Sequence, residues 1–217
     1  MKKYAFYISH RSGRLYKFIN QASTEVLSQI KLVVSDYDIV DELKNLLLDK
    51  QIPFVIINYP ELAGDTNIIK NSELSDKMLE LFEEYNIDYM FSFGSHILSG
   101  ELLKKYENRL INFHPSILPM FPGKNSIDQA VNHGNTFLIG NTAHLMDEGM
   151  DTGKIIMQSV IPIQAFLEGN DYDVVLDIQI DMLNKLIYVL NEDRLIVDGK
   201  AIIKGANYNK GVIFPEI

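Results

Sequence analysis

The amino-terminal half of the sequence alternates short apolar runs with longer segments in which apolar residues recur at helical spacing. The runs Tyr4–Ile8, Ile30–Val34 and Phe54–Asn58 are short and rich in branched and aromatic residues, so they predict strands. The segments between them, Leu15–Leu27 and Ile39–Asp49, have the period of amphipathic helices. Strands joined by crossover helices run parallel, so this pattern constrains the chain to a βαβαβ beginning.

The same alternation continues toward the middle of the chain. We expect a helix over Glu73–Tyr85, a strand over Tyr89–Phe93, a short helix over Gly100–Tyr106 and a strand over Leu110–Phe113. Buried strands of this kind imply an α/β fold: a doubly wound, mostly parallel, Rossmann-like sheet with crossover helices in a single domain. Ligands of such sheets bind at the carboxyl ends of the strands.

The last third of the sequence departs from the parallel pattern. Gly140–Met146 and Ile155–Val160 read as two strands joined by a turn rich in Asp and Gly, which favours an antiparallel hairpin. Tyr172–Leu190 predicts a long final helix, followed by short strands or loop. We expect a catalytic domain over residues 1–195 and a carboxyl-terminal tail over residues 196–217.

Composition narrows the classes of partner. The chain has 217 residues, 47% of them hydrophobic, which is enough for a substantial core. A net charge of −9 argues against sequence-independent binding to nucleic acid or to an anionic membrane, so small molecules are the expected partners. The chain has no cysteine, which excludes disulfides and thiolate chemistry. The first apolar run is too brief for a signal peptide or a membrane span, and we expect a cytoplasmic protein.

The segment Asn112–Pro119 holds the side chains that we most expect to be reactive. Asn112 and His114 stand two residues apart at the end of a predicted strand, so their side chains point to the same side of the sheet. A second segment, His144–Gly153, brings acidic residues, and its Asp151 offers a carboxylate that could close a site.

These segments resemble the formyltransferase family that uses 10-formyltetrahydrofolate, including glycinamide ribonucleotide formyltransferase and the sugar N-formyltransferases. The family signature is Asn-x-His-Pro-Ser-Leu-Leu-Pro followed later by Asp in an Asp-x-Gly turn, and it matches Asn112, His114 and Asp151. The similarity covers roughly residues 4 to 200 and is strongest from about Phe93 to Ile156. It implies an enzyme of one-carbon metabolism with 10-formyltetrahydrofolate as cosubstrate and no metal.

The resemblance implies acyl transfer from a folate formamide to a primary amine. Attack on the formyl carbon produces a negative oxygen, which Asn112 and a protonated His114 would stabilise as hydrogen-bond donors. The amine must lose a proton and the departing folate nitrogen must gain one, and Asp151 is the expected carboxylate for this exchange. A nearby Asp151 also favours the charged form of the imidazole.

The resemblance also implies a folate pocket before and after the catalytic strand. His96 stands where the family usually carries Arg, whereas the neighbouring apolar residues suit a pocket wall or ordinary core. The expected folate contacts are Ser95, His96, Ile97, Leu98, Leu103, His144, Met146, Asp147, Glu148 and Met150.

The main departure from the family lies after the first strand. Purine-pathway members place Gly-x-Gly-Ser-Asn there to hold a substrate phosphate, whereas this chain has the expected substrate-binding residues His10, Arg11, Ser12, Gly13 and Arg14. The Ser-Asn pair expected after the second strand reads Ser35-Asp36, which adds negative charge. Both changes favour a larger phosphorylated acceptor whose diphosphate meets Arg11 and Arg14, although a solvated loop would read the same way.

The sequence thus favours formylation of a nucleotide-linked amino sugar without a covalent intermediate. The first alternative is phosphoribosylglycinamide formyltransferase of purine biosynthesis. Further alternatives are a folate-binding module without turnover and a hydrolase releasing formate. The resemblance associates hydrolases with an additional amino-terminal regulatory domain, which favours a transferase here. The sequence leaves open whether the chain forms a homodimer.

Overall fold

The computed structural model describes residues 1–10, 12–169 and 171–210. The chain folds into two compact units. The first unit contains Met1–Asn112 and the short segment Leu145–Met150. The second contains Phe113–His144 and the chain from Asp151 onward. Each unit is described by itself.

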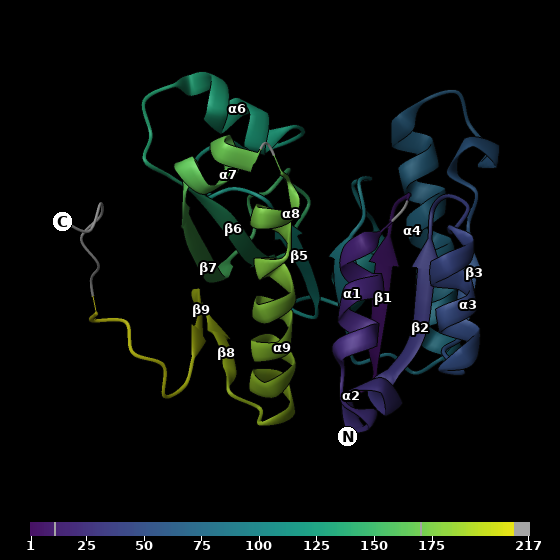
Figure 1. Cartoon of the computed structure of the whole chain (residues 1–217). Helices are drawn as coiled ribbons and strands as arrows, with labels where there is room; N and C mark the ends of the chain where they lie inside the picture. The colour runs from purple at the N-terminus through teal and green to yellow at the C-terminus, as the bar shows by residue number, and fades with distance from the viewer. Residues whose placement is uncertain (11, 170, 211–217) are drawn as a thin grey trace. The chain divides into compact units, whose positions relative to one another are not determined.

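Five parallel strands form the sheet of the first unit, in the order β3-β2-β1-β4-β5. Figure 1 shows β1 and β2 side by side in this sheet. Only the first part of β5 belongs to this unit. The central strand β1 is completely buried, which explains its unbroken apolar sequence. The strands are β1 (Tyr4–Ile8), β2 (Ile30–Ser35), β3 (Phe54–Ile56), β4 (Tyr89–Phe93) and β5 (Leu110–His114).

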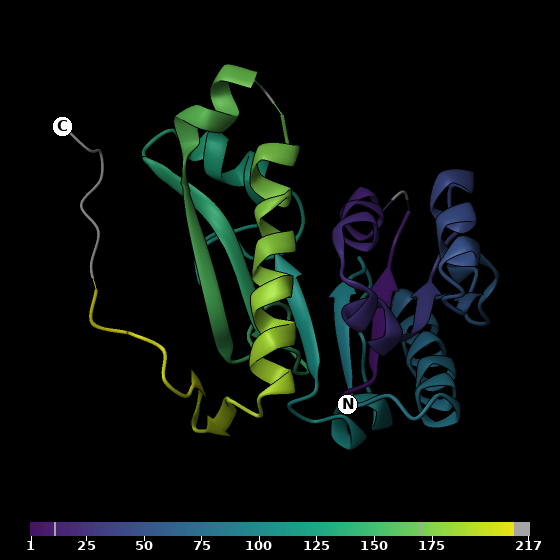
Figure 2. The ribbon, with the colours of Figure 1, turned by 60° about the horizontal axis from the view of Figure 1, so that its bottom comes forward.

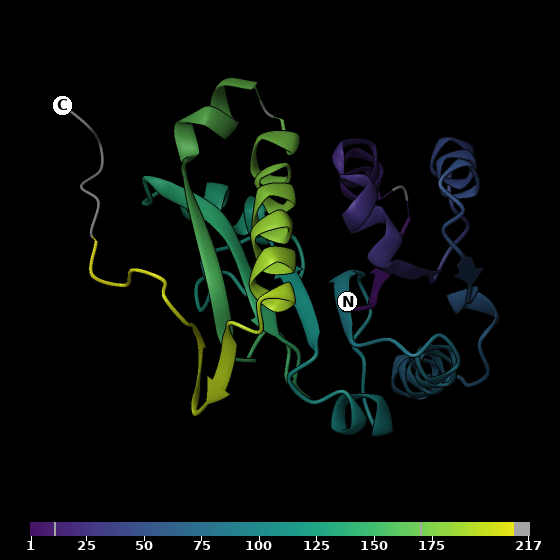
Figure 3. The same ribbon diagram turned by 90° about the horizontal axis from the view of Figure 1, so that it is seen from below.

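Helices cover both faces of this sheet. Figure 3 shows α1 and α3 on one face, with α4 and α5 on the other. The arrangement follows from crossover connections that return each strand in parallel. The helices are α1 (Gly13–Gln21), α2 (Thr24–Gln29), α3 (Asp41–Asp49), α4 (Asn67–Glu84) and α5 (Glu101–Lys105), with the 3₁₀ turn η1 (Tyr59–Glu61) between β3 and α4.

Alternate residues of β1 serve the two faces. Phe6 packs against Phe18 of α1, with ring centroids 5.6 Å apart. Its neighbour Tyr7 belongs to the opposite core cluster, together with Met78 and Phe82 of α4. The two-residue period of a strand therefore supplies both layers of the doubly wound unit.

The second unit is built on the end of β5 and the antiparallel strands β6 and β7. Helix α9 runs alongside β6 and β7 (Figure 2). The elements of the second unit are α6 (Ser126–His133), β6 (Leu138–Leu145), β7 (Ile155–Pro162), α7 (Ile163–Gly169), α8 (Asp173–Leu176) and α9 (Ile178–Asn191), followed by the hairpin β8 (Leu195–Asp198) and β9 (Lys200–Ile203).

A buried amide network ties the helices of this unit to β6. Asn141 donates to the carbonyl of Val175 at 2.8 Å and to Oγ of Ser159 at 3.1 Å. Its own carbonyl oxygen accepts a hydrogen bond from Gln179 at 2.7 Å. Because Asn141 and Gln179 are fully buried, these bonds fix the position of α8 and α9 on the strand.

The predicted fold class is confirmed: a mostly parallel, seven-stranded sheet with crossover helices and an antiparallel hairpin. Several predicted helix bounds were wrong. The helix expected over Leu15–Leu27 is two helices, because Ser23 accepts a hydrogen bond from Val26 and starts α2. Helix α4 begins six residues before Glu73, after Thr66 caps it. The last helix is interrupted at Asp177, between α8 and α9.

Two short helices, α6 and α7, were not predicted, since neither is long enough to show a clear period. Among the described residues, no helix is long and apolar enough to cross a membrane. The expected division of the chain at residue 195 stays a prediction.

Candidate active site

Two histidines of the second unit converge on the carboxylate of Asp151. His114, the last residue of β5, has its Nδ1 atom 3.3 Å from Oδ2 of Asp151. His144 of β6 has its Nε2 atom 3.5 Å from the other oxygen, Oδ1. Both imidazoles are buried, and the carboxylate lies between them. The structure thus brings together His114 and Asp151, which the sequence predicted as catalytic, and adds His144.

A backbone donor fixes the orientation of this carboxylate. The N–H of Gly123 donates to Oδ2 of Asp151 at 2.8 Å. Gly123 has φ of 79° and Asp151 has φ of 56°, so both ends of the contact lie in left-handed backbone. Glycine adopts this conformation readily and Asp tolerates it better than most residues. The turn chemistry of both loops therefore serves to position Asp151.

The surroundings of Asp151 favour its charged form. Burial alone would raise the pKa of this carboxyl group, but the hydrogen bonds from His144 and from the Gly123 N–H, with the charges of the two histidines, lower it. The net result is a pKa below the ordinary value of 3.8. Asp151 is consequently an ionised hydrogen-bond acceptor at neutral pH.

Both ring nitrogens of His114 face oxygen atoms. Nε2 lies 3.0 Å from the carbonyl oxygen of Phe121, and Nδ1 faces Asp151. A neutral imidazole has one N–H, whereas the imidazolium has two and can donate to both oxygens at once. The contact with Phe121 also means that Nε2 is engaged by the protein itself in this structure.

Asn112 lies two residues before His114 on β5 and is half-buried. The alternation of a strand places both side chains on the same face, as the sequence predicts. Asn112 belongs to the first unit and His114 to the second. The catalytic role of Asn112 stays a prediction.

The residues expected to contact folate from the segment after β4 differ in exposure. Leu98 and Leu103 are buried within the core cluster of the first unit, whereas Ile97 is 40% exposed. The backbone N–H of Ser95 donates to Oγ of Ser9 at 2.8 Å. The ring of His96 stacks on Tyr59, with centroids 3.5 Å apart. The two leucines thus have a structural role already, and folate contact remains a prediction for the whole set.

The second part of the expected folate pocket follows β6. Met146 is half-buried, packs against the core of the first unit and donates its N–H to the carbonyl of Leu110 at 2.9 Å. Asp147, Glu148 and Met150 are exposed. Asp147 accepts a hydrogen bond from the N–H of Gly149 at 3.0 Å, which closes a tight turn.

The expected acceptor loop leads into α1. Arg11 lies outside the described residues. His10 is exposed and stacks on Tyr37, whereas Ser12 is buried and precedes the first helical residue, Gly13. Arg14 lies over the ring of Phe93 at 4.6 Å, and burial lowers the pKa of its guanidinium to about 10, so it stays charged at neutral pH.

Comparison with known proteins identifies the family. The sequence pattern that defines the formyl transferase family matches residues 2–174 of this chain. The chain belongs to the formyl transferase family. This family member is 28% identical over 197 residues to a formyltetrahydrofolate deformylase of Escherichia coli (strain K12), covering 90% of this chain and 66% of that protein. It is 33% identical over 142 residues to the human trifunctional purine biosynthetic protein adenosine-3, covering 58% of this chain and 14% of that protein.

The fold of this formyl transferase family member also matches solved structures. Glycinamide ribonucleotide transformylase 1 from Symbiobacterium toebii has a TM-score of 0.76 and 22% identity, with 94% of both chains covered. The chain spans about two thirds of the length of the deformylase and a smaller part of the trifunctional protein. The family match shows the family of the chain, and the likeness to the solved structure shows its fold.

Three contacts in this formyl transferase family member were not predicted from sequence. They are the Phe121 carbonyl on His114, the Gly123 N–H on Asp151 and the pairing of His144 with Asp151. The Asp-x-Gly turn was the available signal, but it does not tell which backbone N–H the carboxylate of Asp151 meets. His144 pairs with Asp151 in the structure. Its contact with folate stays a prediction.

Proposed function

We propose that the chain transfers a formyl group from 10-formyltetrahydrofolate to a primary amine, and that His114 and Asp151 are central to this reaction. The observation that carries the proposal is the half-buried carboxylate of Asp151, which lies between two imidazoles, one of them that of His114 at the Asn-x-His strand end. The family membership and the names of the relatives support the chemistry.

The proposed reaction needs one nucleophilic addition and one elimination. The amine nitrogen forms a bond to the formyl carbon, and the carbonyl electron pair moves to oxygen. Asn112 and the His114 imidazolium donate hydrogen bonds to this oxyanion. The oxyanion then collapses, the bond between carbon and the folate nitrogen breaks, and that nitrogen receives the proton that the amine has released, carried by Asp151 or by water. Asp151, ionised at neutral pH, accepts the proton that the amine releases, directly or through water.

The carbonyl of Phe121 sets a condition on this reaction. It occupies Nε2 of His114 at 3.0 Å, and Nδ1 faces Asp151. A substrate oxygen that receives a hydrogen bond from Nε2 must take the place of the Phe121 carbonyl. Turnover therefore includes a local movement of the loop that holds Phe121.

The proposed acceptor is an amine on a nucleotide-linked sugar. The loop from His10 to Arg14 lacks the small residues that the purine enzymes use, and it offers the charged Arg14 and the amino end of α1. Neither of the relatives described above is named for an amino sugar, and this part of the proposal rests on the loop alone.

Two other substrates have specific support. Phosphoribosylglycinamide is favoured by the human relative named for purine biosynthesis and by the shared fold with a transformylase. Water as the acceptor, which gives formate, is favoured by the deformylase that matches 90% of this chain. All three reactions release tetrahydrofolate and differ in the second product.

The test is a panel of acceptors with 10-formyltetrahydrofolate. We expect tetrahydrofolate release to require an amino-sugar nucleotide and to yield an equal amount of N-formyl product. Release only with glycinamide ribonucleotide would make the purine reaction correct. Formate in the absence of any amine would make the protein a deformylase, and no release under any condition would leave a folate-binding module.

We also propose a cytoplasmic location and small-molecule partners only, with no nucleic acid, membrane or metal. Size-exclusion chromatography with light scattering tests the homodimer that the sequence leaves open. Truncation after residue 195 tests whether the following residues are a dispensable tail.

A further inference from the structure

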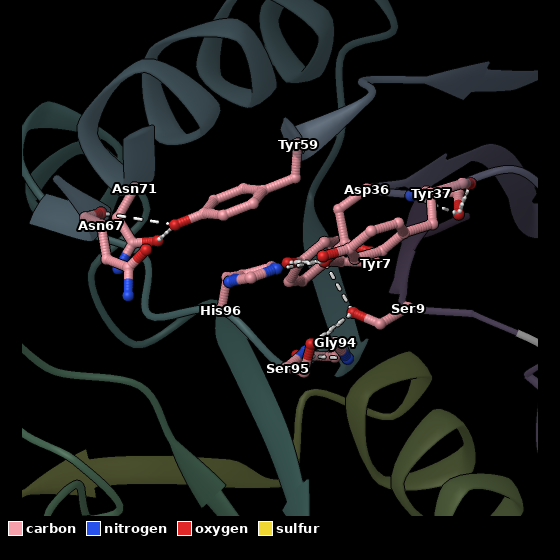
Figure 4. A network of polar contacts seen from close by, with 12 residues as sticks. Tyr7, Ser9, Asp36, Tyr37, Tyr59, Asn67, Asn71, Gly94, Ser95 and His96 are labelled. Atoms are coloured by element: carbon pink, nitrogen blue, oxygen red, sulfur yellow. Dashed lines mark hydrogen bonds and ion pairs between the residues drawn. The ribbon is translucent and has the colours of Figure 1, made fainter. Parts of the chain in front are cut away.

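The first unit contains a buried carboxylate with an incomplete set of partners. Asp36 follows β2 and is fully buried. Its Oδ2 atom accepts hydrogen bonds from the hydroxyls of Tyr7 at 2.5 Å and Ser9 at 2.6 Å, and the Nε2 atom of His96 lies 3.7 Å away (Figure 4). The Oδ1 atom has no hydrogen-bond partner among the described residues. Nearly all buried polar atoms in proteins form hydrogen bonds, so the unpaired Oδ1 atom indicates a place for a further hydrogen-bond donor.

The position of Asp36 in the fold indicates what kind of donor this is. The carboxylate stands at the carboxyl end of the second strand of a βαβ unit, which is where ligands of parallel sheets bind. In nucleotide-binding units of this topology, the phosphate lies at the amino end of the helix after the first strand. An acidic residue after the second strand accepts a hydrogen bond from the ribose 2′-hydroxyl.

The helix end that would hold the phosphate of such a ligand is the start of α1. Helix α1 has nine residues, and its first-turn N–H groups are not capped by the side chain of Ser12. The Oγ atom of Ser12 is buried without a hydrogen-bond partner in the described part of the chain. Ser9, which contacts Asp36, is three residues from Ser12, so their Cα atoms are at most about 11 Å apart.

Aromatic rings surround the carboxylate. Tyr59 stacks on His96, and His10 stacks on Tyr37 with centroids 4.2 Å apart. Figure 4 shows the rings of Tyr7, Tyr37, Tyr59 and His96 gathered at Asp36. Tyr37 is half-buried and His10 is exposed, so they are the outer members of this ring cluster. A sugar that reaches Oδ1 must displace the outer rings, Tyr37 and His10, and any water molecule that takes its place in the free protein.

We propose that Asp36 is a specificity residue that accepts a hydrogen bond from the 2′-hydroxyl of a ribose whose phosphate binds at the amino end of α1. The ligand class is a ribose 5-phosphate unit. The inference rests on the proposed function only for the idea that this unit is part of the acceptor. It selects a ribonucleotide-linked acceptor over a deoxyribonucleotide-linked one and is compatible with glycinamide ribonucleotide.

The test compares ligands that differ by one hydroxyl, without folate. Calorimetry measures the dissociation constants of ribose 5-phosphate and 2-deoxyribose 5-phosphate, and of UDP and 2′-deoxy-UDP, for the wild-type chain. We expect the ribose form of each pair to bind at least about tenfold more tightly, because a hydrogen bond to a charged acceptor is lost in the deoxy form. Equal affinities within the pairs would overturn the proposal, and so would a lack of binding by all four probes.

A variant assigns the preference to Asp36. In Asp36→Asn the side-chain oxygen can still accept from Tyr7 and Ser9, which leaves an NH2 group in place of Oδ1. We expect the preference for ribose to fall below about threefold. Asp38→Asn is the matched control, since Asp38 is exposed and its substitution changes the same charge. An unchanged preference in Asp36→Asn would overturn the assignment, and the wild-type comparison remains decisive if that variant does not fold.

The two proposals fail in different ways. Equal binding of ribose and deoxyribose probes, with normal release of tetrahydrofolate in the acceptor panel, would remove only the role of Asp36. A ribose preference without any formyl transfer would retain the site and remove the proposed reaction.

Discussion

His114 and Asp151 face each other across 3.3 Å, from Nδ1 to Oδ2, although they stand 37 positions apart in the sequence (151 − 114 = 37). The strand end β5 supplies the imidazole and the loop before β7 supplies the carboxylate. Gly123 and His144 hold the carboxylate from two further directions. Asp151 is therefore the centre of the cluster, and its charge state governs how both imidazoles are held.

The low pKa of Asp151 predicts that the free energy of unfolding of the protein falls at acid pH. Its folded-state pKa lies below the ordinary value of 3.8, so the unfolded chain takes up the proton first as the pH falls. The stabilisation is complete above about pH 5 and is lost as the pH falls through the folded-state pKa. Urea unfolding from pH 7 to pH 3 should show the wild-type chain losing its advantage over Asp151→Asn. A constant difference between the two across this range would contradict the assignment.

Tyr7→Phe removes a hydroxyl that donates to a buried carboxylate. The hydrogen bond to Asp36 is 2.5 Å long, and its loss leaves the carboxylate with fewer donors, so we expect a loss of about 1–3 kcal/mol in the free energy of unfolding. Chemical denaturation at pH 7 measures this loss. Tyr16→Phe is the control, since Tyr16 is exposed and its substitution should stay within about 0.5 kcal/mol.

The same substitution has a second, pH-dependent effect. Burial, and then the negative charge of Asp36, raise the pKa of Tyr7 well above its ordinary value of 10.0. A raised folded-state pKa gives stabilisation that is complete below the unfolded value and is lost as the pH rises through the folded value. The stability of the wild-type chain should thus approach that of Tyr7→Phe above about pH 10. A difference that grows with pH in this range would show the reverse sign.

Gly94→Ala should disturb the same network through packing. A Cβ atom at Gly94 would lie 2.0 Å from Cε1 of Tyr7, whose ring is fully buried and has no room to retreat. We expect a loss of about 1–3 kcal/mol or more in stability, as for other overpacked cores. Thermal and urea unfolding measure it. Gly13→Ala is the control because no atom lies within 4 Å of its added Cβ, and a normal stability for Gly94→Ala would contradict the packing described here.

The sequence predicted the fold well where the period was clear. Strand β1 matched the expected bounds because an unbroken apolar run between polar residues has one reading in a parallel sheet. The break between α1 and α2 was missed because apolar residues continue across Ser23, and only the side-chain cap shows that a new helix starts there. Local hydrogen bonding decided this case over hydrophobic period.

The candidate site was predictable in part. His114 and Asp151 were expected together from their motifs, and the structure brings them into contact. The pairing of His144 with the same carboxylate depends on the register of β6 against β7, which residue types alone do not specify. Asp36 was noticed only as a negative charge after the second strand, since its contacts to Tyr7 and Ser9 come from two other places in the chain.

The most direct test of the proposed reaction measures turnover and folate affinity in the same variants. We predict that Asn112→Ala and His114→Ala each lower kcat for tetrahydrofolate release by about 100-fold or more, because each removes a donor to the oxyanion. The dissociation constant of the folate should stay within about threefold of the wild-type value, since the lost interaction forms in the transition state. Asn132→Ala, at an exposed position of α6, is the matched control and should keep a normal rate. Near-normal turnover in His114→Ala would contradict the account.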